Sequence, residues 1–139
     1  MKKFFLTVPK GTAASNFASL LLRVGFGALM IPQHGYAKLV EFAERKGQFM
    51  SFMGLGSTFS LSLAIFAEFF CSIFLIFGLF TRLATIPLLI TVLVIMSVHN
   101  WQFFGKHELA SAFFVGYLAI FLLGPGKFSL DYLLFKRGR

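Results

Sequence analysis

Residues 58–80 read TFSLSLAIFAEFFCSIFLIFGLF, and this stretch decides the fold class. It contains a single charged side chain, Glu68, among otherwise apolar, small or hydroxyl residues. A helix needs roughly 20 mainly apolar residues to cross the hydrocarbon of a bilayer. The stretch therefore predicts a membrane-spanning helix, and the segment Gly78-Leu79-Phe80-Thr81-Arg82 predicts a tight turn at its end.

Three further apolar stretches predict spans at about residues 16–35, 83–99 and 109–124. The last two are short, but flanking side chains and local thinning of the bilayer can accommodate them. Residues 1–10 lack the long apolar region and cleavage site of a secretory signal, so we expect the first span to be retained. The sequence predicts an all-α membrane protein, a four-transmembrane-helix bundle with residues 1–139 in a single domain.

The composition excludes several classes of protein. Of 139 residues, 58% are apolar and 13% charged, whereas a soluble domain usually carries about a quarter charged residues. The chain is too apolar to be disordered, and a lone Cys71 excludes an internal disulfide scaffold. The net charge of +8 would suit a nucleic-acid binder, but the mean hydropathy of +0.82 favours the lipid bilayer as partner.

The basic residues predict the orientation, because cytoplasmic loops carry an excess of Lys and Arg. With four spans, the two termini and the second loop share one side, which holds eight basic residues against four on the other. Both termini are therefore expected in the cytoplasm. The first outer loop, from Lys38 to Gly56, has apolar residues on one helical face. It is expected either to form an interfacial helix or to pack as a loop over the bundle.

Two charges lie inside the predicted spans, where charge is costly and usually faces the bundle interior. Counted along each helix, Arg23 and Glu68 lie about 10 and 18 Å from the cytoplasmic surface, so an Arg23–Glu68 ion pair is geometrically reasonable. It could fix the helix register, or Glu68 could handle protons or contact a substrate. Helical periodicity places each charge on a small and polar stripe expected to face the bundle centre: Asn16, Ser19, Arg23, Gly27, Met30 and His34 in the first span, and Ser57, Ser60, Ala64, Glu68, Cys71 and Ser72 in the second.

A second group of candidates lies at the outer ends of the spans. His34 and Lys38 follow the first span, His99 ends the third, and His107 with Glu108 opens the fourth. This ring could bind a polar head group, and His and acidic residues can exchange protons with a quinone carbonyl. The alternative is an ordinary interfacial rim, in which Trp, His and Lys are common.

Metal and cofactor sites have little support in the sequence. The histidines lie at span ends, and no His-x-x-Glu or Cys-x-x-Cys spacing occurs, so we expect no metal site and no covalently bound cofactor. A single thiol cannot run dithiol exchange, so Cys71 is interpreted as a small packing residue.

The motifs resemble those of the DoxX family of small four-span bacterial membrane proteins, in the right order over about residues 18–134. They are Arg23 with Gly25 and Gly27; His34-Gly35-Tyr36-Ala37-Lys38; Ala67-Glu68-Phe69; Gly78-Leu79-Phe80-Thr81-Arg82; Lys106-His107-Glu108; and Gly124-Pro125-Gly126-Lys127-Phe128-Ser129-Leu130-Asp131. The chain departs from many relatives after the third-span histidine, where Asn100-Trp101-Gln102 stands in place of an acidic residue.

The resemblance implies a multi-pass protein of the bacterial inner membrane. The family takes its name from a subunit of a thiosulfate:quinone oxidoreductase, so it implies a quinone-associated oxidoreductase subunit with a redox partner protein. By position, the family's polar residues correspond to Arg23, His34, Lys38, Glu68, Arg82 and Glu108. The predicted ligand-binding residues are Arg23, His34, Lys38, Glu68, His99 and Glu108. Glu68, His34 and Glu108 are the catalytic candidates.

Two other functions remain open at this stage. One is a non-catalytic membrane scaffold or small-solute carrier, in which the two buried charges serve packing or a proton path. The other is a membrane-embedded isomerase or cyclase that acts on a lipid-like substrate with Glu68 as general acid. An apolar cavity around Glu68 would favour the enzyme, and a solidly packed bundle would count against it. A homo-oligomer is compatible with each of these functions.

Overall fold

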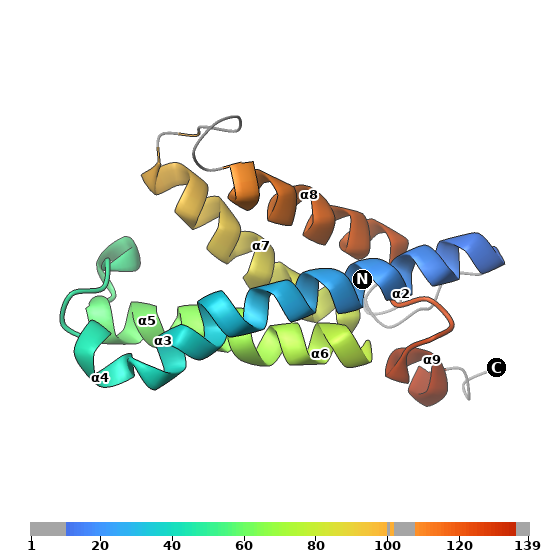
Figure 1. Ribbon diagram of the computed structural model, residues 1–139, viewed down its shortest axis with the longest axis horizontal. Coiled ribbons are helices and arrows are strands. Elements are labelled where there is room, and N and C mark those ends of the chain that lie inside the picture. Colours follow the sequence, from blue (N-terminus) through green and yellow to red (C-terminus); the bar gives the residue numbers. More distant parts are fainter. Residues whose placement is uncertain (1–10, 100, 102–107, 136–139) are drawn as a thin grey trace.

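The computed structural model describes residues 11–99, 101 and 108–135, and all regular structure within them is helical (Figure 1). The elements are α2 (Ala13–Met30), η1 (Ile31–Tyr36), α3 (Ala37–Val40), α4 (Phe42–Arg45), η2 (Phe52–Gly54), α5 (Ser57–Ile65), η3 (Phe66–Cys71), α6 (Ser72–Phe77), α7 (Thr81–Val98), α8 (Glu108–Leu123) and α9 (Leu130–Phe135). Of the η elements, η1 and η3 are π-helical turns and η2 is a 3₁₀ turn.

Three helical stretches of the described chain are long and apolar enough to cross a membrane. They are Ala13–Val40, in which α2, η1 and α3 are continuous, Ser57–Phe77, formed by α5, η3 and α6, and Thr81–Val98, which is α7. The fourth predicted span is present as α8, an apolar helix of 16 residues. All four predicted stretches are therefore helical, and the first continues past its predicted end at Gly35.

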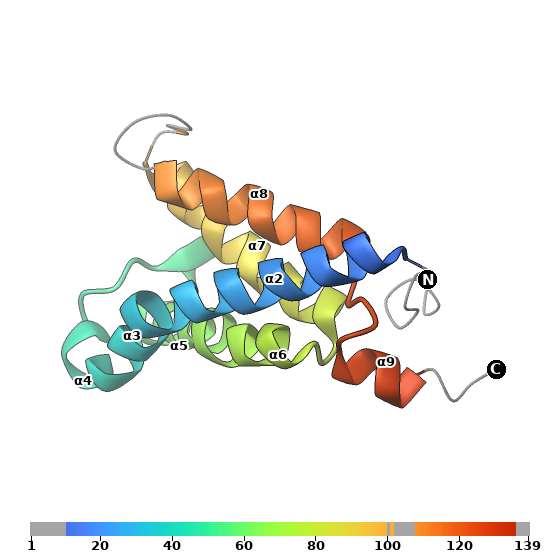
Figure 2. The ribbon, with the colours of Figure 1, turned by 45° about the vertical axis from the view of Figure 1, so that its right-hand side comes forward.

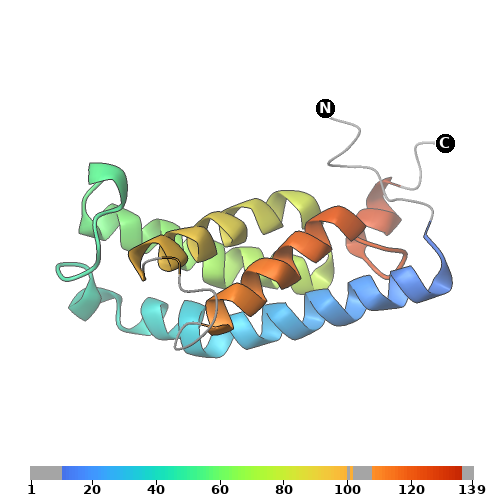
Figure 3. The ribbon, with the colours of Figure 1, turned by 90° about the horizontal axis from the view of Figure 1, so that it is seen from above.

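The long helices pack side by side into a bundle (Figures 2 and 3). Helix α7 lies against α8, while α2 packs against both α6 and α8. The start of α2 and the short helix α9 lie at the same end of the bundle, which we call the termini end (Figures 1 and 2). The core between the helices is apolar and includes Leu75, Leu88, Val92, Tyr117 and Ile120.

The first helix buries its polar face and exposes its apolar one, which is the arrangement expected of a helix in lipid. Its buried residues are Asn16, Ser19, Arg23, Gly27 and Met30, so the predicted stripe is confirmed to that point. Apolar residues point outward, with Phe17, Leu21 and Leu29 each at least 60% exposed. The Glu68 stripe is also largely buried, since Ser60, Glu68, Cys71 and Ser72 are all inside.

A cluster of hydrogen bonds closes the termini end. The buried carboxylate of Asp131 accepts from the backbone N–H groups of Phe80 (2.7 Å) and Thr81 (2.9 Å) and from the Thr81 hydroxyl (2.9 Å). The carboxylate thereby caps the N-terminus of α7 (Thr81–Val98). Phe80, the residue directly before this helix, has a φ of 47° and its side chain provides no cap. The backbone N–H of Asp131 in turn donates to the Gly78 carbonyl at 2.9 Å. The start of α9 is thus fastened to the α6–α7 turn.

The first outer loop does not form one interfacial helix. It contains only the short helices α3 and α4 and the turn η2, where Met53 has a positive φ of 48° that interrupts the helical geometry. Two serines tie the loop down, since Ser60 Oγ accepts from the Phe52 N–H (2.8 Å) and Ser57 Oγ donates to the Lys46 carbonyl (2.7 Å). Of the two sequence-based alternatives, the structure has the loop packed over the bundle.

Candidate functional site

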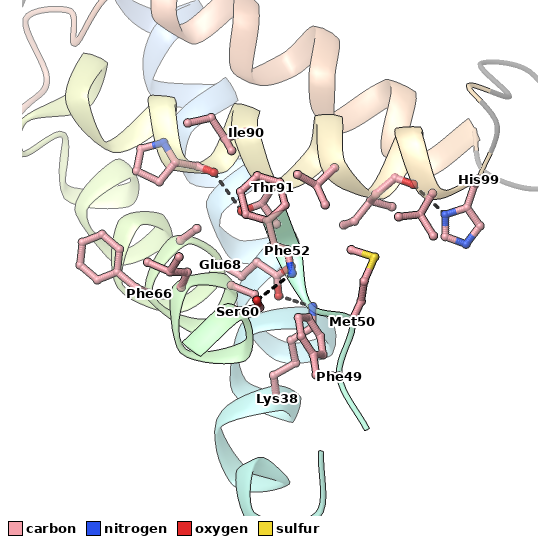
Figure 4. Close-up of a pocket in the computed structure, with 17 residues that line it drawn as sticks. Lys38, Phe49, Met50, Phe52, Ser60, Phe66, Glu68, Ile90, Thr91 and His99 are labelled. Atoms are coloured by element: carbon pink, nitrogen blue, oxygen red, sulfur yellow. Dashed lines mark hydrogen bonds and ion pairs between the residues drawn. The ribbon is translucent and has the colours of Figure 1, made fainter. Parts of the chain in front are cut away.

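An apolar pocket of about 560 Å³ lies between the packed outer loop, the α5–η3 helix and α7 (Figure 4). Lys38 and Glu68 meet at one part of its lining and His99 lies apart from them at the C-terminal end of α7 (Figure 4), while most of its wall is aliphatic or aromatic. The residues that line it are Lys38, Phe49, Met50, Phe52, Ser60, Leu63, Ala64, Phe66, Ala67, Glu68, Pro87, Ile90, Thr91, Val94, Ile95, Val98 and His99. Its volume falls in the range of pockets that hold small-molecule ligands.

An ion pair forms the charged part of this pocket. The Nζ atom of Lys38 donates to Oε2 of Glu68 at 2.5 Å, and the side chains of the two residues are 15% and 1% exposed (Figure 4). Removing two charges from water is expensive, and their attraction repays it only with good geometry. The long Lys38 side chain lets its charge reach Glu68 from the mouth of the pocket.

Two π-helical turns place this pair. Gly35 in η1 packs directly on the backbone of η3, and a Cβ at Gly35 would lie 2.7 Å from the carbonyl carbon and oxygen of Glu68 and from the amide of Phe69. Only glycine allows this approach. A π-turn changes the direction of the side chains that follow it and is frequent at functional sites. The close contact therefore sets the position of Glu68 relative to Lys38, which lies three residues after Gly35.

The predicted Arg23–Glu68 ion pair is wrong. The Arg23 guanidinium points to the termini end, where Nη2 donates to the Phe128 carbonyl at 2.6 Å and Nη1 contacts the carbonyls of Leu75 and Ile76 at 3.4 Å. These two carbonyls belong to the last turn of α6, where the helix dipole favours a cation. Axial depth alone made the pair reasonable, but depth does not show toward which end a side chain extends.

The structure brings together only part of the predicted outer ring. His99 lines the pocket, and its Nδ1 hydrogen-bonds the Ile95 carbonyl at 2.7 Å. His34 does not line the pocket, because its ring packs edge-on against Phe113 with centroids 6.0 Å apart. The charges of Glu68 and Lys38 nevertheless lie close enough to act on its ring.

The remaining candidates lie elsewhere. Glu108 is exposed at the start of α8 and does not line the pocket. His107 lies outside the described residues. Cys71 is buried in the hydrophobic core at 2% exposure, which agrees with its predicted packing role. Among residues 11–99, 101 and 108–135, no three His, Cys, Asp or Glu side chains are arranged to hold a metal ion.

Several pocket residues were not identified from the sequence. Phe49, Met50 and Phe52 reach the pocket because the outer loop folds back, and the alternating apolar residues of that loop were the available signal. Thr91 is a polar residue inside the third span, and its hydroxyl donates to the Pro87 carbonyl at 2.9 Å. This is an ordinary bond from a hydroxyl to the carbonyl one turn earlier in the helix.

The arrangement combines an apolar chamber with a paired cation and carboxylate and, at the C-terminal end of α7, an imidazole. Lys38 can donate hydrogen bonds to a carbonyl oxygen, while carboxylate and imidazole groups can accept or release protons. The apolar walls suit a ligand with a hydrocarbon part. The chamber therefore fits an amphiphilic molecule with a polar head and an apolar tail.

Comparison with protein families agrees with this picture of a membrane protein. The chain matches the DoxX family model over residues 18–101, which is more than half of its length and includes Arg23, Lys38, Glu68 and His99. No curated protein and no solved structure matches the chain. The match and the apolar helices indicate an integral membrane protein, and the chain belongs to the DoxX family.

Proposed function

We propose that this protein is a quinone-associated subunit of a membrane redox system, and that the quinone binds in the apolar pocket lined by Lys38 and Glu68. The observation that supports the proposal is the ion pair of Lys38 and Glu68 at the side of an apolar pocket of about 560 Å³. The quinone ring would lie beside Lys38, Glu68 and His99, and the isoprenoid tail would follow the apolar wall.

The chemistry of the three polar residues suits this ligand. Lys38 would donate a hydrogen bond to a quinone carbonyl, and its ammonium would stabilise negative charge that develops on the ring during reduction. Glu68 and His99 would exchange protons with the ring oxygens. The sequence carries no flavin, haem or iron–sulfur motif, so the proposal assigns the supply of electrons to a partner protein.

The same proposal includes the topology. Helix α8 would be a fourth span about 24 Å long, with the termini end in the cytoplasm of a bacterium and the pocket toward the outer face of the inner membrane. The excess of basic residues that the sequence carries in its two terminal segments and second loop supports this orientation. Cysteines introduced singly at Thr12 and at Gln48 would test it, because a membrane-impermeant thiol reagent should label only the second from outside intact cells in a Cys71→Ser background.

Quinone binding can be measured with the natural fluorophore of the chain. Trp101 is the only tryptophan and follows the pocket residue His99 by two positions, so a bound quinone should quench its fluorescence. Short-tailed ubiquinone and menaquinone analogues would be titrated into the protein in lipid nanodiscs. Saturable quenching is expected in the natural protein, with affinity at least about tenfold lower in Lys38→Met and Glu68→Gln, since each loses a charge-assisted contact.

Matched variants control for partition of the quinone into lipid. Lys46→Met and Glu44→Gln remove exposed charges from the same outer loop and should bind as the natural protein does. Non-saturable quenching that is equal in all variants would overturn the proposal.

One structural observation also favours a second candidate, the membrane-embedded isomerase or cyclase. An apolar pocket that reaches a buried carboxyl group suits a lipid-like substrate with Glu68 as general acid. Conversion of a lipid substrate by the purified protein, without quinone or redox partner and abolished in Glu68→Gln, would favour this reading. A scaffold or carrier would instead show altered assembly or uptake in Glu68→Gln and no saturable quinone binding.

A further inference from the structure

Four buried polar atoms in the bundle have no hydrogen-bond partner among the described residues. They are Nε of Arg23, Oε1 of Glu68, Oγ of Ser72 and Oη of Tyr117. Each residue is at most 1% exposed. Buried polar groups in folded proteins are almost always paired with protein or with ordered water, so four such atoms in one bundle require an explanation.

These atoms belong to side chains that neighbour one another. Glu68 and Ser72 lie one turn apart on the helix formed by η3 and α6, and the carbonyls that hold Arg23, at Leu75 and Ile76, lie one turn further. Helix α2 runs close to this face, since a Cβ at Gly27 would lie 3.1 Å from the Ser72 carbonyl oxygen. The set therefore follows the contact between α2 and α6 from the pocket toward the termini end.

Tyr117 joins the set from the opposite helix, α8. Its ring packs against those of Phe26 and Phe113, with centroids 6.0 and 5.7 Å away, and these two rings also contact each other. The Ser72 hydroxyl and the Glu68 carboxylate are the polar groups nearest its hydroxyl, and the Ser72 and Tyr117 hydroxyls approach each other without reaching the geometry of a full hydrogen bond. The hydroxyls and the carboxylate thus share one region of the interior without satisfying one another.

We infer that Glu68, Ser72 and Tyr117 bind water inside the bundle and that Glu68 exchanges protons through this water. Arg23 lies at the boundary of the water site toward the termini end. The two oxygens of Glu68 have different partners. Oε2 accepts from Lys38 at the pocket, whereas Oε1 has no protein donor and accepts from the bound water. Water needs two to four polar partners in such a site, and Oε1 of Glu68, Oγ of Ser72 and Oη of Tyr117 supply three. The positive charge of Arg23 hinders passage of protons beyond the site, as arginine does in selective pores.

The site gives the carboxylate a proton route that an apolar ligand in the pocket does not block. This consequence rests on the proposed function, but the water site itself does not. Within the part of the chain that the structure describes, the titratable and charged groups around Glu68 are Lys38 on α3, His34 on η1, His99 at the C-terminal cap of α7 and Tyr117 on α8. Of these, Tyr117 contributes the hydroxyl on the interior side.

Hydroxyl-radical footprinting with mass spectrometry tests the water site directly, because radicals formed from bound water oxidise side chains beside it. We expect oxidation of Tyr117 despite its 0% exposure, and none of Met96, a more reactive side chain that is buried in the apolar core at 2% exposure. Ser72→Ala should abolish the oxidation of Tyr117, whereas Ser97→Ala on the exposed face of α7 should leave it unchanged. Absence of Tyr117 oxidation, or equal oxidation in Ser72→Ala, would overturn the inference.

Proton exchange is tested by infrared spectroscopy after a rapid drop in pH, in protein that has been titrated with a short-tailed quinone analogue. The protonated carboxyl band of Glu68 is identified by its loss in Glu68→Gln. Its appearance should slow at least about tenfold in Ser72→Ala/Tyr117→Phe, and not in Ser97→Ala/Tyr36→Phe, which alters exposed residues. Equal rates in the two double variants contradict the proton route. If the protein does not bind the quinone, the footprinting result still decides the water site, so failure of the proposed function is distinguished from failure of this inference.

Discussion

The Nζ atom of Lys38 lies 2.5 Å from Oε2 of Glu68, although 30 positions separate the two residues in the chain. This contact joins α3, the last part of the first long helix, to the middle of the second. Both side chains are largely withdrawn from solvent, so each charge depends on the other for compensation.

Removal of one partner should therefore cost more than removal of both. Lys38→Met leaves the buried Glu68 carboxylate uncompensated, and we expect a loss of about 3–5 kcal/mol in the free energy of unfolding. The double variant Lys38→Met/Glu68→Gln should recover most of this loss. Unfolding by SDS titration in mixed micelles provides the measurement, with Glu44→Gln as an exposed control. Equal losses in the single and double variants would show that the pair does not act as a unit.

Substitution of Gly35 should separate the two π-helical turns. A Cβ at this position would meet the backbone of Glu68 and Phe69 at 2.7 Å, and backbone cannot move aside as a flexible side chain can. We expect Gly35→Ala to lose about 1–3 kcal/mol of stability. Gly25→Ala is the matched control, because no atom lies within 4 Å of its added Cβ and alanine favours the helix by about 0.5–1 kcal/mol. A Gly35→Ala protein as stable as Gly25→Ala would refute the close packing of η1 on η3.

The cap of α7 should depend on Asp131. Its carboxylate accepts from two backbone N–H groups and one hydroxyl, which makes it the side-chain cap that Phe80 does not provide. Asp131→Ala should cost about 1–2 kcal/mol, the range of a lost helix cap. Hydrogen exchange at the start of α7 should rise in this variant and remain unchanged in Glu108→Gln, an exposed acidic residue at the start of α8. Unchanged exchange at Phe80 and Thr81 would contradict the capping role.

Arg23 should not be replaceable by lysine. Its planar guanidinium reaches the Phe128 carbonyl with one nitrogen and the Leu75 and Ile76 carbonyls with another, a fork that a single ammonium group cannot reproduce. We expect Arg23→Lys to retain the fold but to loosen the segment at residues 124–131, detected as faster hydrogen exchange there. The exposed Arg45→Lys serves as control, and protection at residues 124–131 equal to that of the natural protein would argue against the fork.

Much of the architecture could be predicted because lipid imposes simple rules. The stripe from Asn16 to Met30 follows from helical periodicity, since a helix in a membrane must turn its polar residues inward. The long apolar stretches likewise predict helices, and the turn at Gly78 matches a left-handed φ of 68°. These features depend on local sequence alone.

The partners of the buried charges could not be predicted in the same way. The rise per residue gave the depths of Arg23 and Glu68 but not the direction of either side chain. Lys38 was assigned to the outer ring rather than to Glu68, because neither π-helical turn has a signature in the sequence. Asp131 was named only as the last residue of the motif that begins at Gly124, since its role depends on a contact with residues about 50 positions earlier.

The contact of Arg23 with the Phe128 carbonyl has a consequence for the order of assembly. The chain is synthesised from its N-terminus, so Arg23 enters the bilayer before any of the carbonyls that hold it have been made. Leu75 and Ile76 arrive with the second helix, but the shortest contact, at 2.6 Å, waits for a residue 105 positions later. The guanidinium thus gains its shortest hydrogen bond only after Phe128 has been synthesised. A chain stopped before Phe128 would leave this guanidinium nitrogen without that acceptor.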